Sequence, residues 1–148
     1  MDTIVFKSSV HPLSRLIMIG LPIGLIILPI LILNDGEAVT ADIIACTIML
    51  VTAVLSIWVL ADTKYVIQNN AILIYNSGPI KGKIDIQSIR KIEHQKGWIS
   101  KSILKPSLDI NGLYIYYNKF DDIYFSPKDK EAFVNYLLKI NPKIEIIR

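Results

Sequence analysis

The titratable side chains of the sequence form no pattern that would support catalysis or metal binding. The two histidines, His11 and His94, are far apart, and neither has a Cys, His or carboxylate at a spacing typical of a metal site. Glu93 is only the chain neighbour of His94. Asp121 and Asp122 lie in the segment NKFDD, where Asn and Asp favour a turn. We therefore expect no enzyme activity, no metal ion and no cofactor.

The side chains that do stand out are basic. Between positions 81 and 105 the sequence has seven Lys and Arg residues and two carboxylates, and Trp98 and the aliphatic Ile99, Ile103 and Leu104 lie in the same stretch. A cationic surface beside an anionic leaflet gains ~1 kcal/mol per Lys or Arg, and Trp favours the headgroup region. The run predicts a surface that contacts lipid headgroups or a protein partner; the alternative is a solvated face with Trp98 and the aliphatic residues folded into the core. The candidate contact residues are Lys81, Lys83, Arg90, Lys91, Lys96, Trp98, Lys101 and Lys105.

Two long uncharged runs precede this basic stretch. Leu16–Leu33 has eighteen residues and Ile43–Ala61 has nineteen. A helix rises ~1.5 Å per residue, so ~20 residues cross the hydrocarbon core of a bilayer. A secretory signal has a shorter apolar region, and the remaining chain is too small to bury both runs as core helices. We expect an N-terminal cytoplasmic segment (1–15), a two-helix transmembrane hairpin (16–61) and a soluble domain (62–148).

The charges around the two runs predict how the hairpin lies in the membrane. Lys7 and Arg15 precede the first run, Lys64 follows the second, and the connection at 34–42 has acidic residues but no Lys or Arg. Cytoplasmic segments are enriched in Lys and Arg, so both termini are expected in the cytoplasm. Region 62–148 has 14 Lys and Arg against 9 Asp and Glu. This excess is too modest to favour nucleic-acid binding.

Gly20 and Gly24 form a GxxxG spacing that allows two helices to approach closely. The preferred partner is the second run of the same hairpin, where Ala45, Ala53 and Ser56 are small. The alternative is a contact between two chains, which would make the protein a homo-oligomer.

The pattern of the region after Asp62 predicts strands followed by one helix. Asn69 and Asn70 favour a two-residue hairpin turn, and NSGP at 76–79 favours a second turn. The expected strands are 64–68, 71–76, 80–86, 88–95, 112–118 and 122–126, with a long loop at 96–111. Ser126 is the expected N-cap of an amphipathic helix that ends at Asn141. These elements predict an α+β domain with a strongly bent antiparallel sheet, or split barrel, capped by the C-terminal helix.

Several segments resemble the bacterial pleckstrin-homology-like (PH-like) domains of the YyaB-like type, formerly a family of unknown function. They are YNSGPIKGKIDIQSIRKI at 75–92, LYIYYNKFDDIYFSPKDKEAFVNYLLKINPKIEI at 113–146, and VFKSSVHP at 5–12, which is similar to an N-terminal Phe-Lys-Ser segment of the family. The resemblance covers nearly the whole chain. It implies N-terminal membrane helices, a short PH-like domain, residence in a bacterial cytoplasmic membrane and no established activity.

The sequence therefore predicts a membrane-anchored PH-like binding or scaffolding module on the cytoplasmic face. Its expected partners are the lipid bilayer and either anionic headgroups or a membrane protein. One alternative is an immunity or stress-response protein against membrane-active antimicrobial peptides, which would first meet Asp35 and Glu37. The less favoured alternative is an enzyme with an unrecognised site around Tyr114, Tyr116 and Asp122.

Overall fold

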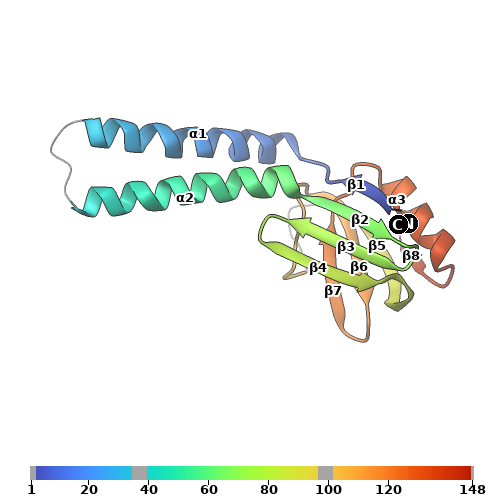
Figure 1. Cartoon of the computed structure of the whole chain (residues 1–148). Coiled ribbons are helices and arrows are strands. Elements are labelled where there is room, and N and C mark those ends of the chain that lie inside the picture. Colours follow the sequence, from blue (N-terminus) through green and yellow to red (C-terminus); the bar gives the residue numbers. More distant parts are fainter. Residues whose placement is uncertain (1–2, 35–39, 97–101, 148) are drawn as a thin grey trace.

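A computed structural model describes residues 3–34, 40–96 and 102–147. Two antiparallel helices, α1 (Pro12–Asn34) and α2 (Thr40–Asp62), form a long hairpin that projects from a domain of strands with one further helix (Figure 1). Strand β1 (Thr3–Lys7) precedes the hairpin, and the rest of the domain follows it. The two predicted apolar helices are confirmed.

Both helices are long and apolar enough to cross a membrane. Each has 23 residues, which corresponds to ~34 Å at ~1.5 Å per residue. Their most apolar windows have mean hydropathies of 2.9 and 2.6, and only 11% of each window is buried inside the protein. The rest of the described chain therefore leaves these helices uncovered, whereas a soluble fold would bury its core helices.

Hydroxyl groups within α2 are satisfied by the helix itself. Thr47, Thr52 and Ser56 each donate a hydrogen bond of 2.8 Å to the carbonyl oxygen four residues earlier. Such bonds remove the cost of placing a hydroxyl in an apolar environment. These three hydroxyl groups are thus compatible with a lipid surrounding.

The domain contains two four-stranded sheets, with strand orders β1-β2-β3-β4 and β7-β6-β5-β8. They do not join into a closed barrel, and the predicted PH-like α+β fold is confirmed. The remaining elements are β2 (Lys64–Gln68), β3 (Ile72–Ser77), β4 (Ile80–Asp85), the 3-10 turn η1 (Ile86–Ser88), β5 (Ile89–Lys96), β6 (Asn111–Tyr117), β7 (Asp121–Phe125), α3 (Lys130–Ile140) and β8 (Glu145–Ile147).

The predicted hairpin turns form at residues that tolerate left-handed backbone angles. Asn69 and Asn70 have φ values of 54° and 50° between β2 and β3, Gly78 has 57° between β3 and β4, and Asn118 has 48° between β6 and β7. Asn and Gly enter this region more readily than other residues. The local turn chemistry therefore sets the connections of both sheets.

The predicted start of the C-terminal helix is wrong by several residues. The N-cap of α3 is Asp129, whose carboxylate accepts the amide of Ala132 at 2.9 Å. Ser126 is fully buried before the helix, where its hydroxyl bonds to Ser8 (2.9 Å) and Ser107 (2.7 Å). Because the Ser126 hydroxyl already forms these two hydrogen bonds, it does not cap the helix, and Asp129 is the N-cap instead. The predicted end at Asn141 is confirmed.

Two strands were not predicted, and one of them is parallel. β1, from the N-terminal segment, pairs antiparallel with β2, from Thr3 opposite Gln68 to Lys7 opposite Lys64. β8 pairs parallel with β5, so the sheets are not wholly antiparallel as expected. The division of the chain at residues 15 and 61 stays a prediction, but residues on both sides of the hairpin build one sheet.

The core lies between the two sheets and under α3. Tyr65, Phe125 and Phe133 are fully buried and meet ring to ring, with centroids 4.5 Å apart for Tyr65 and Phe125. Phe6 of β1 packs edge-on against Phe133 at 5.1 Å. The predicted apolar stripe of the helix is confirmed at Phe133, Val134 and Leu137, which are buried.

Candidate functional site

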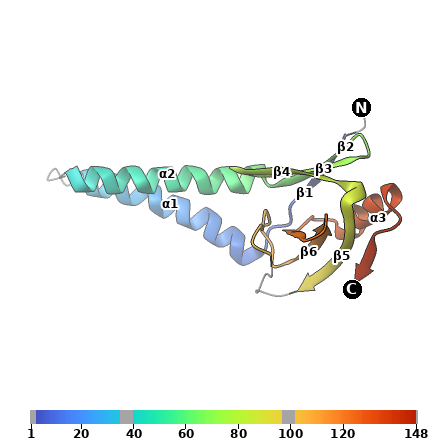
Figure 2. The same cartoon turned by 90° about the horizontal axis from the view of Figure 1, so that it is seen from below.

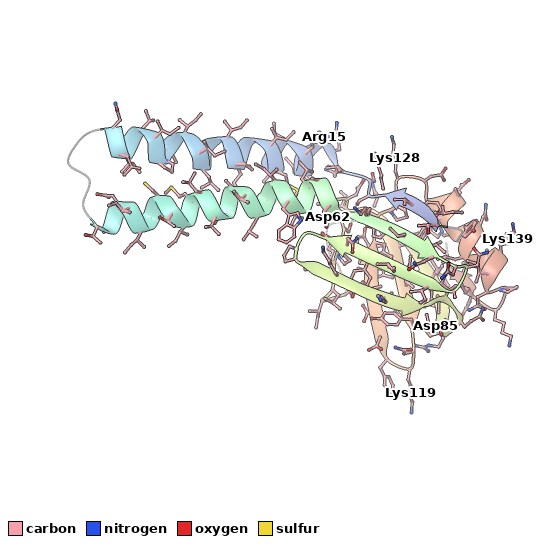
Figure 3. All side chains as sticks on the ribbon, viewed as in Figure 1. Arg15, Asp62, Asp85, Lys119, Lys128 and Lys139 are labelled. Carbon is pink, nitrogen blue, oxygen red and sulfur yellow. The ribbon has the colours of Figure 1, made fainter. Side chains whose placement is uncertain are left out.

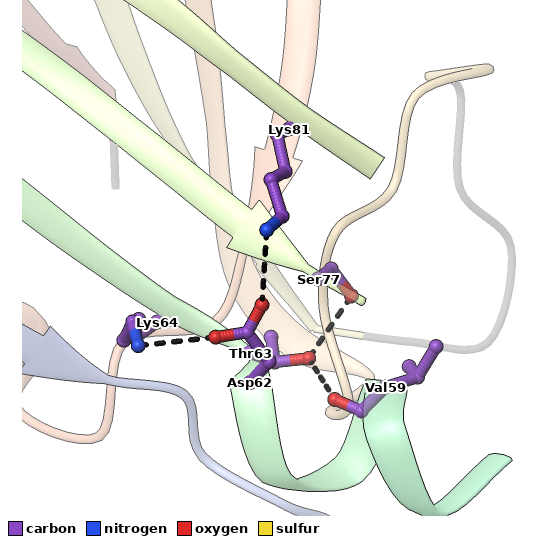
Figure 4. Close-up of polar contacts among 6 residues, drawn as sticks. All are labelled: Val59, Asp62, Thr63, Lys64, Ser77 and Lys81. Carbon is purple, nitrogen blue, oxygen red and sulfur yellow. Dashed lines mark hydrogen bonds and ion pairs between the residues drawn. The ribbon is translucent and has the colours of Figure 1, made fainter. Parts of the chain in front are cut away.

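The end of α2 is tightly attached to the β3–β4 hairpin. Thr63, the one residue between α2 and β2, donates its hydroxyl to the Val59 carbonyl at 2.6 Å and lies 2.9 Å from the Ser77 hydroxyl (Figure 4). A Cβ atom on Gly78 would lie 2.7 Å from Cγ2 of Val59, and the positive φ of Gly78 also disfavours a side chain. Glycine thus allows the β3–β4 turn to touch the last turn of α2.

An acidic residue at the same junction forms ion pairs with two lysines. Asp62 forms ion pairs with Lys64 at 3.0 Å and with Lys81 at 3.8 Å (Figure 4). The Lys81 ammonium also lies 5.8 Å from the ring of Trp58, one turn earlier on α2. The first residue of the predicted basic run is therefore fixed at the base of the helical hairpin.

Exposed apolar side chains accompany the lysines at this end of the domain. Ile103 is 100% exposed, and Trp58, Ile80 and Leu104 are between 42% and 44% exposed. Ile80 and Lys105 line one cavity together with residues of both helices. We call this surface the hairpin-proximal face; it consists of Trp58, Ile80, Lys81, Ile103, Leu104 and Lys105.

The segment after residue 101 is held against β7, the edge strand of the second sheet. The Leu104 carbonyl accepts the Tyr124 amide at 3.1 Å and the Ser102 hydroxyl at 2.9 Å. The Lys105 ammonium lies 5.0 Å from the Tyr124 ring. The predicted long loop is confirmed for residues 102–110, and these bonds leave Ile103 pointing into the surroundings.

The structure divides the predicted basic run among several places. Lys81 and Lys105 lie on the hairpin-proximal face, and Lys83 is exposed on β4, between Lys81 and Asp85 at the far end of that strand (Figure 3). Arg90 donates to the Lys119 carbonyl at 3.0 Å, at a tip remote from the helices (Figure 3).

Of the remaining candidate contact residues, one makes contacts within the second sheet, and three have side chains that are not described. Lys91 lies 3.4 Å from the Glu93 carboxylate and 4.7 Å from the Tyr116 ring. The Lys96 side chain, Trp98 and Lys101 lie outside the described residues.

The contact between α1 and α2 does not use the GxxxG glycines. A Cβ atom at Gly20 or Gly24 would meet nothing within 4 Å. The buried residues of the two helices are instead Pro22 and Pro29 on α1 and Cys46 and Ala53 on α2. Each pair is seven residues apart and so lies on one side of its helix, two turns apart. Ala53 was predicted at this contact, and Ala45 is exposed. Packing between two chains through Gly20 and Gly24 stays a prediction.

The residues considered for an enzyme site make structural contacts. Tyr114 is fully buried, with its ring 4.9 Å from that of Tyr124. Tyr116 donates to the Glu93 carboxylate at 3.1 Å. Burial, followed by this hydrogen bond to an anion, raises the pKa of Tyr116 to about 12. A phenol with a raised pKa holds its proton at neutral pH and is a poor general base.

Metal binding and peptide recognition were the other chemistries considered. Among the described residues, no group of three His, Cys, Asp or Glu side chains could hold a metal ion. Asp35 and Glu37, on which the immunity alternative depends, lie outside the described residues, so that alternative stays a prediction.

A buried polar cluster joins the N-terminal segment to the domain, and no sequence pattern indicated it. The Tyr65 hydroxyl donates to the Pro106 carbonyl at 2.8 Å and accepts the Ser126 amide at 2.9 Å. The Ser126 hydroxyl contacts Ser8 and Ser107. Burial raises the pKa of Tyr65. The cluster satisfies buried polar groups where four segments distant in the sequence meet, so its role is structural.

Comparison with known proteins agrees with this architecture. A family model described as "Bacterial PH domain" matches residues 63–141, just over half of the chain. No curated protein and no solved structure matches the sequence. The YyaB-like subtype stays a prediction. The match begins at Thr63, where the hairpin ends, and closes at Asn141, where α3 ends. This chain is therefore a member of the bacterial PH domain family.

Proposed function

We propose that this protein is a membrane-anchored PH-like module that rests its hairpin-proximal face on the lipid headgroups of one leaflet. Helices α1 and α2 cross the bilayer, and the domain serves there as a binding or scaffolding platform. PH domains typically bind lipids or proteins. The observation that carries the proposal is the clustering of exposed Trp58, Ile80, Ile103 and Leu104 with two lysines at the base of the apolar hairpin.

The composition of this face suits the boundary between water and lipid. Exposed apolar patches with a polar rim mark interaction surfaces. Lys81 and Lys105 would each gain ~1 kcal/mol near an anionic leaflet, and Trp58 combines an apolar ring with an N–H donor for the headgroup region. Three of the six large apolar side chains exposed in the described part of the domain, Ile80, Ile103 and Leu104, belong to the face.

The charge distribution supports a cytoplasmic location for the domain. Lys7 and Arg15 precede the hairpin and Lys64 follows it, whereas the connection between the helices has no Lys or Arg. Under the positive-inside rule, both termini and the PH-like domain lie in the cytoplasm of the bacterial cell.

A fluorescent probe on Ile103 tests the contact with lipid. In a Cys46→Ser background, Ile103→Cys is labelled with an environment-sensitive fluorophore, and the full chain is placed in nanodiscs. We expect blue-shifted emission and quenching by nitroxide lipids, with a larger effect when the nanodisc contains phosphatidylglycerol. High salt should weaken only the anionic component, because it screens charges.

Phe120→Cys is the matched control. Phe120 is an apolar residue, 82% exposed, in the β6–β7 turn, next to the remote Lys119. A probe there should report water in every nanodisc. Aqueous emission at both positions would refute the proposal.

A further inference from the structure

A cavity of about 350 Å³ lies where the two helices meet the domain. α1 contributes Ser14, Ile17 and Met18 from its first two turns, and α2 contributes Val59 from its last turn. α1 diverges from α2 toward the domain (Figure 2), and residues of the β3–β4 turn and of segment 105–110 line the rest of the cavity. A volume of this size is typical of small-ligand sites.

The lining combines apolar side chains with two charged groups. Ile17, Met18 and Val59 form an apolar side on the helices, and Lys105 and Asp109 supply one cation and one anion from the domain. This pairing of a positive and a negative group with an apolar wall matches a zwitterionic amphiphile.

Both charged groups have capacity for a ligand. The Asp109 carboxylate accepts the Ser9 hydroxyl and the Asn111 amide, which orients it and leaves further lone pairs on its oxygens. Lys105 faces the Tyr124 ring and forms no ion pair with any carboxylate of the described residues. Ser14 adds a hydroxyl to the lining.

The depth of the cavity indicates which molecules surround it. Helices of 23 residues span ~34 Å, whereas the hydrocarbon core is ~30 Å thick. When the helices cross a bilayer, their ends near the domain therefore lie at the level of the headgroups. The most abundant amphiphile at that depth is phospholipid.

We propose that this cavity binds one phospholipid whose headgroup carries a primary ammonium, such as phosphatidylethanolamine. Its phosphate meets Lys105 and Ser14, its ammonium donates to Asp109, and the upper part of one acyl chain lies along Ile17 and Met18. A trimethylammonium headgroup cannot donate these hydrogen bonds, and phosphatidylglycerol brings no cation to Asp109. The proposal rests on the membrane anchoring proposed above and adds a defined site and headgroup class to it.

Native mass spectrometry of the full chain in mild detergent tests the headgroup preference. With equal amounts of phosphatidylethanolamine, phosphatidylcholine and phosphatidylglycerol, the wild type should retain one phosphatidylethanolamine in preference to the others. Lys105→Gln should reduce retention of all three, and Asp109→Asn should lower phosphatidylethanolamine to the level of phosphatidylcholine. Lys83→Gln, which removes an exposed lysine outside the cavity, should change nothing.

Two cavity-filling variants test the position. Met18→Trp and Ile17→Trp should abolish retention, whereas Ile27→Trp, at an exposed position higher on α1, should not. Equal retention of the three lipids by the wild type, or retention that survives both cavity-filling variants, would overturn the proposal. The Ile103 probe separates the two proposals. If the probe reports membrane contact but no lipid is retained, only the lipid site is refuted. If a lipid is retained but the probe reports water, only the contact of the hairpin-proximal face with the membrane is refuted.

Discussion

At the scale of single residues, Asn141 shows how one buried amide connects α3 to the sheets. Its side-chain nitrogen donates to the carbonyls of Ile86 (3.0 Å) and Ile89 (3.1 Å), and its side-chain oxygen accepts the Lys143 amide at 3.1 Å. The residue is 3% exposed. The pair Asn141-Pro142 predicts the end of a helix. The bonds from Asn141 to residues more than fifty positions earlier are visible only in the fold.

Asn141→Ala should lower the free energy of unfolding by about 1–3 kcal/mol, because it leaves buried carbonyl groups without donors. Urea unfolding of the full chain in detergent micelles measures the change. Asn135→Ala is the matched control, since Asn135 is exposed on the same helix and its loss should change stability by no more than about 0.5 kcal/mol. Equal effects of the two substitutions would contradict the assigned role of Asn141.

The raised pKa of Tyr116 predicts a loss of folding stability at alkaline pH. Its pKa is about 12 in the folded protein, above the ordinary value of 10.0, so folding favours the neutral phenol. The contribution of this group to stability is complete below pH 10 and is lost as the pH rises toward 12. Tyrosinate absorbance should show a late component near pH 12 whose amplitude falls by the share of one tyrosine in Tyr116→Phe, because Tyr65, Tyr117 and Tyr124 also have raised pKa values.

Glu93→Gln separates the causes of this shift. Removing the carboxylate that accepts the Tyr116 hydrogen bond should move the late component partway back toward pH 10, while burial keeps the rest of the shift. An unchanged midpoint would exclude Glu93 as a contributor.

At the scale of elements, the sequence predicted features that depend on neighbouring residues. The turns at Asn69-Asn70 and Gly78 and the β6–β7 hairpin were predictable because turn chemistry acts over a few positions. β1 and β8 were missed because their pairing depends on residues far away in the chain.

The candidate site was predictable only in part. Lys81 and Lys105 were named from charge alone, and Ile103 and Leu104 from their place in the loop. Nothing in the sequence separates them from Arg90 and Lys91, which occupy other parts of the sheet. Trp58 lies inside an apolar run, where its position above Lys81 cannot be recognised before α2 is placed against the β3–β4 hairpin.

The contact between α2 and the β3–β4 turn should be sensitive to one methyl group. Gly78→Ala introduces a Cβ 2.7 Å from Val59 Cγ2 and strains a residue with φ of +57°, so we expect a loss of about 1–3 kcal/mol and faster proteolysis at the junction. Gly20→Ala is the control, because its Cβ meets open space and alanine favours a helix by about 1 kcal/mol. A stable Gly78→Ala variant with unchanged proteolysis would contradict the close contact.

At the scale of the whole molecule, the sheet joins the two ends of the helical hairpin. β1 leads into α1, α2 leads into β2, and β1 and β2 are paired along five residues. A fragment consisting of residues 62–148 would lack β1 and the contact of Phe6 with Phe133. Experiments on this protein therefore need the full chain. The same pairing holds the PH-like domain close to the membrane surface when the helices span it.

The membrane topology of the hairpin most directly tests whether α1 and α2 span the bilayer. In a Cys46→Ser background, single cysteines replace Thr40, at the start of α2, or Lys119, at the remote end of the domain. Intact bacterial cells are treated with a membrane-impermeant maleimide. We expect labelling of Thr40→Cys before lysis and of Lys119→Cys only after it. Labelling of both positions from the same side would contradict a two-helix span that holds the domain at the inner face of the membrane.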